Sequence, residues 1–245
     1  GLTTPSPQQE IKVRDRLRQV PSVREVTVEA PIPPTKLNDD TALAQHFSNP
    51  YTLRPVSGEA FYGRRRELLQ LVNNLRNVRP GEAVLLWGPR RIGKTSLLLQ
   101  FQQYVMNRED YVMAYLDMQR LSGRPTTMFL RDIIKSICQA LPESHAKPPS
   151  YNRLKKDPLS YFRGFLENLP ALQNRLLVLI LDEFQLLADL KPDGVSLEDL
   201  NRYFRSLIQH RHGLSIIFSG GGLLEQLLQQ PDASFMLEVA RHQKI

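Results

Sequence analysis

Residues 83–95, AVLLWGPRRIGKT, decide the fold of this chain. Gly88–Thr95 fit the pattern G-x-x-x-x-G-K-[ST] without a mismatch, and they stand between a short apolar run and an amphipathic segment. A glycine-rich turn between a buried strand and a helix points backbone N–H groups and the positive end of the helix dipole at a polyphosphate. We therefore expect this loop to bind the phosphates of a nucleotide.

The residues of the loop have different expected roles. Lys94 is expected to reach the β- and γ-phosphates, and the Thr95 hydroxyl to ligate Mg²⁺. Arg90 and Arg91 either touch phosphates or stay solvated, so we assign them no catalytic role. The candidate nucleotide-binding residues of the loop are Gly88, Pro89, Arg90, Arg91, Ile92, Gly93, Lys94, Thr95 and Ser96.

A second apolar run, Leu176–Leu181, ends in the acidic pair Asp182 and Glu183. A carboxylate at the carboxyl end of a buried strand lies at the sheet edge where phosphates bind. We expect Asp182 to hold the Mg²⁺ shell and Glu183 to polarise the water that attacks the γ-phosphate. Two solvated loop acids are the alternative. The chain contains no N-K-x-D guanine-reading tetrapeptide, so ATP is favoured over GTP.

The remaining apolar runs predict a parallel sheet covered on both faces by helices. We expect an α/β fold, the three-layer sandwich of P-loop nucleotide triphosphatases, with a mostly parallel sheet and an N-terminal extension. Cys138 falls on the apolar face of an expected helix and is assigned to the core. The expected strands are 83–87, 111–116, 176–181 and 214–218, with a possible fifth from 243, and the expected helices are 67–75, 94–105, 127–141, 158–169, 197–209 and 223–229.

Two further residues are weaker catalytic candidates. Ser219 ends the strand at 214–218, and it could orient the attacking water if that strand lies beside the Asp182 strand. A turn serine before Gly220 is an equal alternative. Arg241 precedes the possible fifth strand, where it could reach the ATP of a neighbouring subunit, although a solvated surface arginine fits as well.

Composition and charge limit the class of protein. The chain has 245 residues, a single cysteine and a net charge of +7. With one cysteine there is no disulfide framework, which favours a cytoplasmic location. We expect no membrane span and no secretory signal. Residues 1–48 carry as many acidic as basic residues and are expected to be a partly ordered arm or linker, so the positive excess lies in residues 49–245. That excess leaves nucleic acid open as a partner.

Residues 49–245 resemble prokaryotic ATPases of the STAND and archaeal-ATPase group, close to the origin-recognition branch of the AAA+ superfamily. The resemblance rests on the two motifs above and on two upstream boxes, Asn49–Tyr51 and Phe61–Arg64. It implies that Gly63 and Arg64 lie near the nucleotide, with Tyr51 or Pro50 near adenine. It also implies a polar sensor at Ser219 and an intersubunit arginine at Arg241. The family continues into a helical lid and often a winged helix, and we expect neither within residues 49–245.

Three functions remain open at this point. The resemblance implies an Mg-ATP-hydrolysing switch or assembly motor in a signalling or defence complex, acting as a homo-oligomer or within a larger protein assembly. The positive charge favours a DNA-associated ATPase, such as a loader or a regulator of recombination or transposition. The third is a scaffold that nucleotide stabilises without turnover, and Glu183 argues against it because a pure binder needs no base.

Overall fold

The computed structural model describes residues 54–76, 83–106, 108–210, 213–222 and 240–245. The expected N-terminal arm, Pro50, Tyr51 and the expected helix at 223–229 lie outside the described residues. Within the described part of the chain, no helix has the length and apolar character needed to cross a membrane.

A five-stranded sheet, parallel throughout, forms the centre of the fold, in the order β2-β3-β4-β1-β5. The strands β1 to β4 start where the apolar runs predict, because each of these runs is buried between two layers. The strands are β1 (Ala83–Trp87), β2 (Tyr111–Asp117), β3 (Leu176–Asp182), β4 (Leu214–Gly220) and β5 (Ala240–Lys244).

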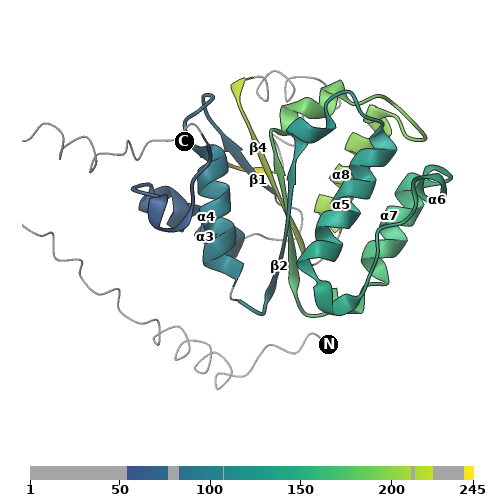
Figure 1. The fold of residues 1–245 in the computed structure, drawn as a ribbon, viewed down its shortest axis with the longest axis horizontal. Helices are drawn as coiled ribbons and strands as arrows, with labels where there is room; N and C mark the ends of the chain where they lie inside the picture. The colour runs from purple at the N-terminus through teal and green to yellow at the C-terminus, as the bar shows by residue number, and fades with distance from the viewer. Residues whose placement is uncertain (1–53, 77–82, 107, 211–212, 223–239) are drawn as a thin grey trace, which may run out of the picture. The chain divides into compact units, whose positions relative to one another are not determined.

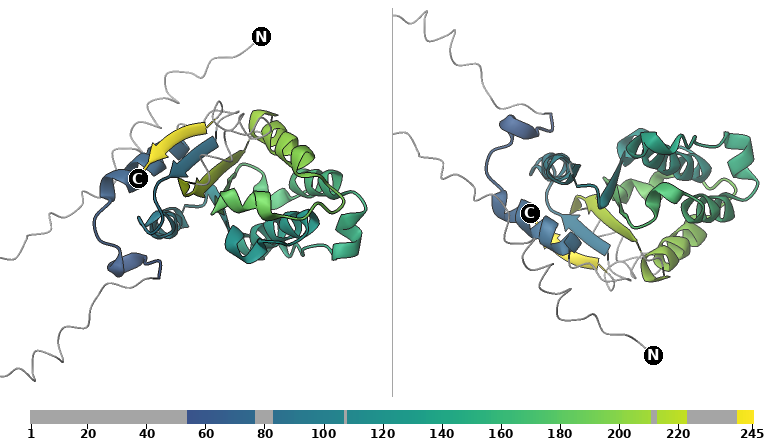
Figure 2. Two further views of the ribbon diagram at one scale, coloured as in Figure 1. Left: turned by 90° about the horizontal axis from the view of Figure 1, so that it is seen from above. Right: turned by 90° about the horizontal axis from the view of Figure 1, so that it is seen from below.

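Helices cover both faces of this sheet, which confirms the expected three-layer α/β sandwich. Figures 1 and 2 show α3 and α4 on one side of the strands and α5, α7 and α8 on the other. The α-helices are α3 (Arg65–Arg76), α4 (Lys94–Met106), α5 (Thr126–Ala140), α6 (Tyr151–Lys155), α7 (Pro158–Glu167) and α8 (Leu197–His210). The 3-10 helices are η1 (Gly58–Ala60), η2 (Met118–Leu121), η3 (Pro142–Ser144), η4 (Pro170–Leu172) and η5 (Phe184–Asp189).

Two apolar clusters result from the alternation of side chains along each strand. The larger core joins Leu85 and Leu179 to α5, α7 and α8, and it includes Cys138. The smaller core joins Val84 and Ile180 to α3 and α4. Neighbouring residues of one strand thus belong to different cores, which explains why the strand sequences are apolar throughout.

Local sequence signals set several element ends. Asp157 caps α7, because its carboxylate accepts from the backbone N–H of Ser160 at 3.2 Å, and Pro158 occupies the first turn. The short helix α6 and the 3-10 helices were not expected from the sequence. Among them, η2 and η5 directly follow β2 and β3, so both lie at the carboxyl edge of the sheet.

The fifth strand begins earlier than the sequence indicated. We expected it from Gln243, with Arg241 preceding it, but β5 spans Ala240–Lys244 and Arg241 lies inside it. Among the described strands, β5 is an edge strand that pairs only with β1 and is only partly covered. It carries polar residues and lacks the apolar signal of the inner strands.

Candidate functional site

The phosphate loop connects β1 to α4 through two residues with positive φ. Arg91 has φ 62° and Gly93 has φ 94°, a value that side chains rarely tolerate. The helix begins at once, since the N–H of Leu97 bonds to the carbonyl of Gly93 at 2.9 Å. The first N–H groups of an α-helix have no partner within the helix, so the start of α4 can offer N–H groups to a phosphate on the loop.

At Gly88 a side chain is excluded by a close contact with the backbone of Ile245, and not by the backbone conformation. A Cβ added there would lie 2.8 Å from the backbone oxygen of Ile245, closer than carbon and oxygen pack. The backbone N–H of Ile245 in turn donates to Trp87 O at 3.0 Å. The start of the loop is therefore packed against the residue that follows β5.

Lys94 is folded back into the loop that precedes it. Its side chain is 5% exposed, and Nζ donates to the carbonyl oxygens of Gly88 at 3.0 Å and Pro89 at 2.9 Å. Burial lowers the pKa of this ammonium, against the opposing influence of Glu183 and Asp182. A lysine whose charge is paired only with carbonyl dipoles and nearby acids can transfer its hydrogen bonds to phosphate oxygens.

Asp182 joins the two sequence motifs. Its carboxylate is buried, and Oδ2 accepts hydrogen bonds from Thr95 Oγ1 at 2.7 Å and from the hydroxyl of Tyr115 at 2.9 Å. The other oxygen, Oδ1, accepts from the N–H of Glu183 at 3.0 Å. A hydroxyl and a carboxylate side by side are the hard oxygen ligands that Mg²⁺ prefers, so the residues present fit this ion.

Tyr115 is a site residue that the sequence analysis missed. Burial, followed by the charge of Asp182 and the hydrogen bond to it, raises the pKa of this phenol far above its ordinary value. The hydroxyl therefore remains a donor. The sequence showed that Tyr115 lies on an expected strand, but its contact with Asp182 depends on β2 lying beside β3.

Glu183 follows β3 with φ 55°, in the left-handed region. This backbone turn directs its carboxylate to Gln185, whose Nε2 donates to Oε2, while Gln185 Oε1 is buried without a hydrogen-bond partner among the described residues. Both side chains line a cavity of about 330 Å³ beside the phosphate loop. Its lining residues are Arg90, Gln119, Ser122, Glu183, Gln185, Leu186, Gly221 and Gly222. The pairing of Glu183 with Gln185 was not expected from the sequence.

Ser219 lies where the sequence hypothesis required. Strand β4 runs between β3 and β1, with Phe218 opposite Leu181 and Ser219 opposite Leu86. The Ser219 side chain is fully buried, and its Oγ has no hydrogen-bond partner in the described part of the chain. The strand adjacency is therefore confirmed, and the serine stands between the two motifs.

The upstream box also reaches the phosphate loop. Gly63 and Arg64 both have positive φ, 73° and 50°, and Arg64 Nε lies 3.8 Å from the position of a Cβ on Gly93. Arg64 also lies 3.9 Å from the carboxylate of Glu67. Ser96, assigned to the nucleotide from the motif, has its hydroxyl engaged, since it accepts from the N–H of Val56 at 3.1 Å.

Arg241 is the candidate that the structure does not bring to this site. It pairs with Val84 near the start of β1, whereas the phosphate loop follows the end of that strand. Within one chain, Arg241 and the phosphate loop therefore lie at opposite ends of the parallel strands. Arg90 and Arg91 are exposed at the loop.

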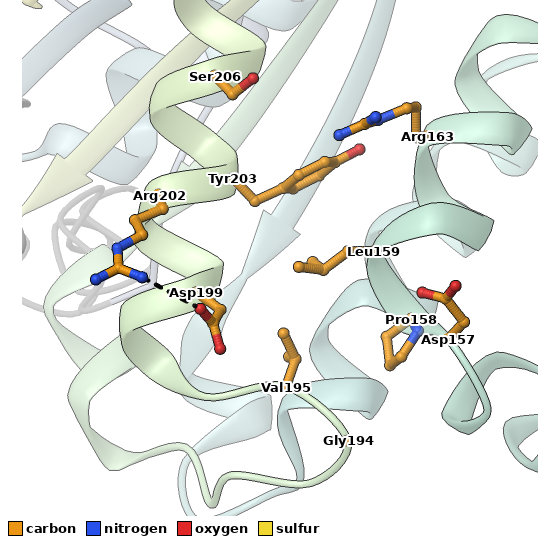
Figure 3. A pocket seen from close by; sticks show the side chains of 10 residues that line it. All are labelled: Asp157, Pro158, Leu159, Arg163, Gly194, Val195, Asp199, Arg202, Tyr203 and Ser206. Atoms are coloured by element: carbon orange, nitrogen blue, oxygen red, sulfur yellow. Dashed lines mark ion pairs between the residues drawn. The ribbon is translucent and has the colours of Figure 1, made fainter.

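A second cavity, of about 390 Å³, lies between α7 and α8 and is separate from these residues. Figure 3 shows Tyr203 and Arg163 on facing helices, with the Arg163 guanidinium 5.9 Å from the centre of the Tyr203 ring. The lining of this second cavity includes none of the residues expected to bind nucleotide.

A sequence profile of a family described as an ATPase domain predominantly from Archaea matches residues 61–232, more than half of the chain. An uncharacterised ATP-binding protein of Methanocaldococcus jannaschii is 26% identical over 172 residues, which cover 62% of this chain and 48% of the relative. One from Pyrococcus abyssi is 28% identical over 165 residues, 62% of this chain and 47% of the relative. The chain thus spans about half the length of these curated relatives.

Solved structures show the same fold. A Walker-type ATPase of Pyrococcus abyssi aligns with a TM-score of 0.56 and 21% identity, over 79% of this chain and 56% of that one. A Drosophila ORC assembly bound to poly(dA/dT) DNA and Cdc6 contains a chain with a TM-score of 0.50 and 14% identity, over 74% of this chain and 28% of that one. At such identities the likeness concerns the fold alone.

Proposed function

The chain belongs to the family of ATPase domains found predominantly in Archaea, and on that premise we propose that it binds Mg-ATP and hydrolyses it. The observation that carries the proposal is the 2.7 Å hydrogen bond between Thr95 and Asp182, two residues 87 positions apart in sequence. It joins the phosphate loop to the acidic strand end in one site.

The phosphates would lie along the loop Gly88–Ser96, with Arg64 and Gly63 beside it. Lys94 would exchange its two carbonyl partners for phosphate oxygens. Thr95 and Asp182 would hold Mg²⁺, whose charge offsets the negative charge that develops on the phosphate oxygens.

Glu183 is proposed as the group that receives a proton from the attacking water. The water oxygen bonds to the γ-phosphorus, the bond from that phosphorus to the β–γ bridging oxygen breaks, and ADP and phosphate leave. Gln185 would hold the Glu183 carboxylate, and the unpartnered Ser219 hydroxyl would contact the γ-phosphate or the water.

Substitution of Glu183 tests hydrolysis separately from binding. Glu183→Gln is expected to bind a fluorescent ATP analogue like wild type and to turn ATP over about 10²–10⁴-fold more slowly, because general-base catalysis is lost. Lys94→Ala, the matched binding variant, is expected to lose ATP binding. Wild-type turnover in Glu183→Gln would remove its role as base, and tight binding by Lys94→Ala would refute the loop assignment.

We further propose that turnover is slow and serves a nucleotide-dependent switch in a signalling or defence assembly, as in STAND ATPases. The carbonyl hydrogen bonds of Lys94 and the unpartnered Ser219 Oγ support this proposal, because both side chains could turn to a γ-phosphate. Such contacts would distinguish ATP from ADP and bias two arrangements of the protein. A rapid turnover that no partner alters would contradict it.

A role for Arg241 between subunits is part of the same proposal. Among the described strands, β5 is the edge of the sheet next to β1, and an intersubunit role requires that another copy of the chain approaches this edge. If Arg241 acts on a neighbour's ATP, the ATPase rate per molecule should rise with protein concentration, and Arg241→Ala should abolish that rise. A rate independent of concentration would leave the site complete within one chain.

A DNA-associated ATPase is the second candidate function, because the net charge of +7 arises entirely from residues 49–245. Binding to duplex DNA should then be measurable at low salt and fall steeply as salt rises, since phosphate contacts release counterions. Stimulation of ATPase by DNA would place this function first, and no binding at low salt would exclude it.

A further inference from the structure

The hydroxyl of Tyr115 reaches the proposed metal site from a strand that carries neither motif. Strands β2 and β3 pair in parallel, with Tyr115 opposite Ile180 and Asp117 opposite Asp182. Tyr115 therefore lies two residues before the position level with Asp182, on the same face of the sheet. Its ring packs against the smaller core, and its long side chain carries the hydroxyl to Asp182 Oδ2 at 2.9 Å.

The donors around the Asp182 carboxylate have different roles. The N–H of Glu183 holds Oδ1, while Oδ2 accepts from Thr95 and from Tyr115. The Thr95 hydroxyl is itself a proposed metal ligand, so its geometry must suit the ion. Among these donors, Tyr115 is thus the side chain that can fix Oδ2 without binding the metal.

We propose that Tyr115 is a positioning residue, whose hydroxyl sets Asp182 Oδ2 toward Thr95 before Mg-ATP binds. This inference rests on the proposed Mg-ATP site. Hydrogen bonds from outer residues orient metal-binding carboxylates, and their loss typically weakens metal binding about 10–100-fold. A preset carboxylate also avoids the entropy cost of ordering Asp182 on binding.

The inference predicts a specific defect in Tyr115→Phe, which removes one oxygen and keeps the ring. A fluorescent ATP analogue is titrated into each protein in EDTA and at graded Mg²⁺ concentrations. For Tyr115→Phe we expect unchanged affinity in EDTA, because Lys94 and the loop are intact. The Mg²⁺ concentration that gives half of the Mg²⁺-dependent gain in affinity should rise about 10–100-fold.

Tyr111→Phe is the matched control. Tyr111 is the first residue of β2, it also packs against the smaller core, and it lies at the opposite end of the strand from Asp182. This variant should show wild-type Mg²⁺ dependence, and thermal unfolding without nucleotide reports the stability of all three proteins.

The outcomes separate the inference from the function on which it rests. Wild-type Mg²⁺ dependence in Tyr115→Phe would overturn the positioning role alone. An equal loss of affinity in EDTA and in Mg²⁺ would also overturn it, because that result indicates a purely structural tyrosine. If wild type itself gains no affinity from Mg²⁺, the proposed Mg-ATP site fails.

Discussion

The two faces of the sheet differ in both packing and content. Among the described residues, the face under α5, α7 and α8 buries a much larger apolar cluster than the face under α3 and α4. Yet Lys94 and Thr95 begin α4, Arg64 precedes α3, and the Tyr115 ring packs on that smaller side. The comparison suggests that the larger core supplies stability while the smaller core also fixes the geometry of the site.

The largest expected effect is on stability alone and tests the larger face. Phe129 on α5 is fully buried, with its ring 5.9 Å from that of Phe204. Phe129→Ala should lower the free energy of unfolding by about 3–5 kcal/mol, because it removes buried contacts and leaves a cavity. Urea unfolding measures this loss. ATP affinity under folding conditions should stay unchanged, and a large loss of affinity would break the division between the faces.

A slightly smaller loss of stability is expected on the other face, with a second consequence. Leu97 is fully buried on α4, three residues after Lys94. Leu97→Ala should cost about 2–5 kcal/mol. It should also weaken binding of the ATP analogue at temperatures where the protein is folded, because the start of α4 shifts with its packing. If affinity is retained while stability falls, the smaller core does not fix the site.

A polar link on the smaller face should contribute less. Gln243 of β5 is buried, its Nε2 donates to Glu67 O at 2.8 Å, and its Oε1 accepts from Asn74 at 3.2 Å. Gln243→Leu should cost about 1–3 kcal/mol, since it removes both hydrogen bonds that join β5 to α3. Hydrogen exchange of α3 amides should report the loosening. Protection equal to wild type would show that packing alone holds α3.

The smallest effect expected is a dependence on pH. Burial lowers the Lys94 pKa below its ordinary 10.5, so between the lowered pKa and 10.5 the unfolded chain binds more protons than the folded one. Without nucleotide, stability from this group therefore rises with pH across that window. ATP needs the charged ammonium, so affinity should fall there, by at most about tenfold per pH unit.

Lys94→Arg is the control for that measurement, because arginine stays charged throughout. Its ATP affinity should be weaker but flat over the same window, as followed by titration with the fluorescent analogue. The same pH dependence in this variant would assign the titration to another group.

The sequence predicted the four apolar strands β1 to β4 and the meeting of Thr95 with Asp182, because apolar runs and a complete motif leave few alternatives. It could not predict that Tyr115 contacts Asp182, since this contact depends on strand order and register. The Glu183–Gln185 hydrogen bond depends on the left-handed backbone conformation of Glu183, which the sequence does not predict because the residue is not glycine. The start of β5 was misplaced because this edge strand consists mostly of polar residues, whereas the other edge strand, β2, carries an apolar run.

The position of Gly88 has a consequence for how such chains diverge. Its missing side chain makes room for the backbone oxygen of Ile245, so this glycine serves the joint between β1 and β5, independently of any phosphate. A descendant that had abandoned nucleotides would thus still be selected to keep Gly88, while Lys94 and Thr95 became free to drift. When distant relatives are compared, Lys94 and Thr95 are therefore the positions that indicate whether nucleotide binding is retained. The first glycine of the motif does not indicate it.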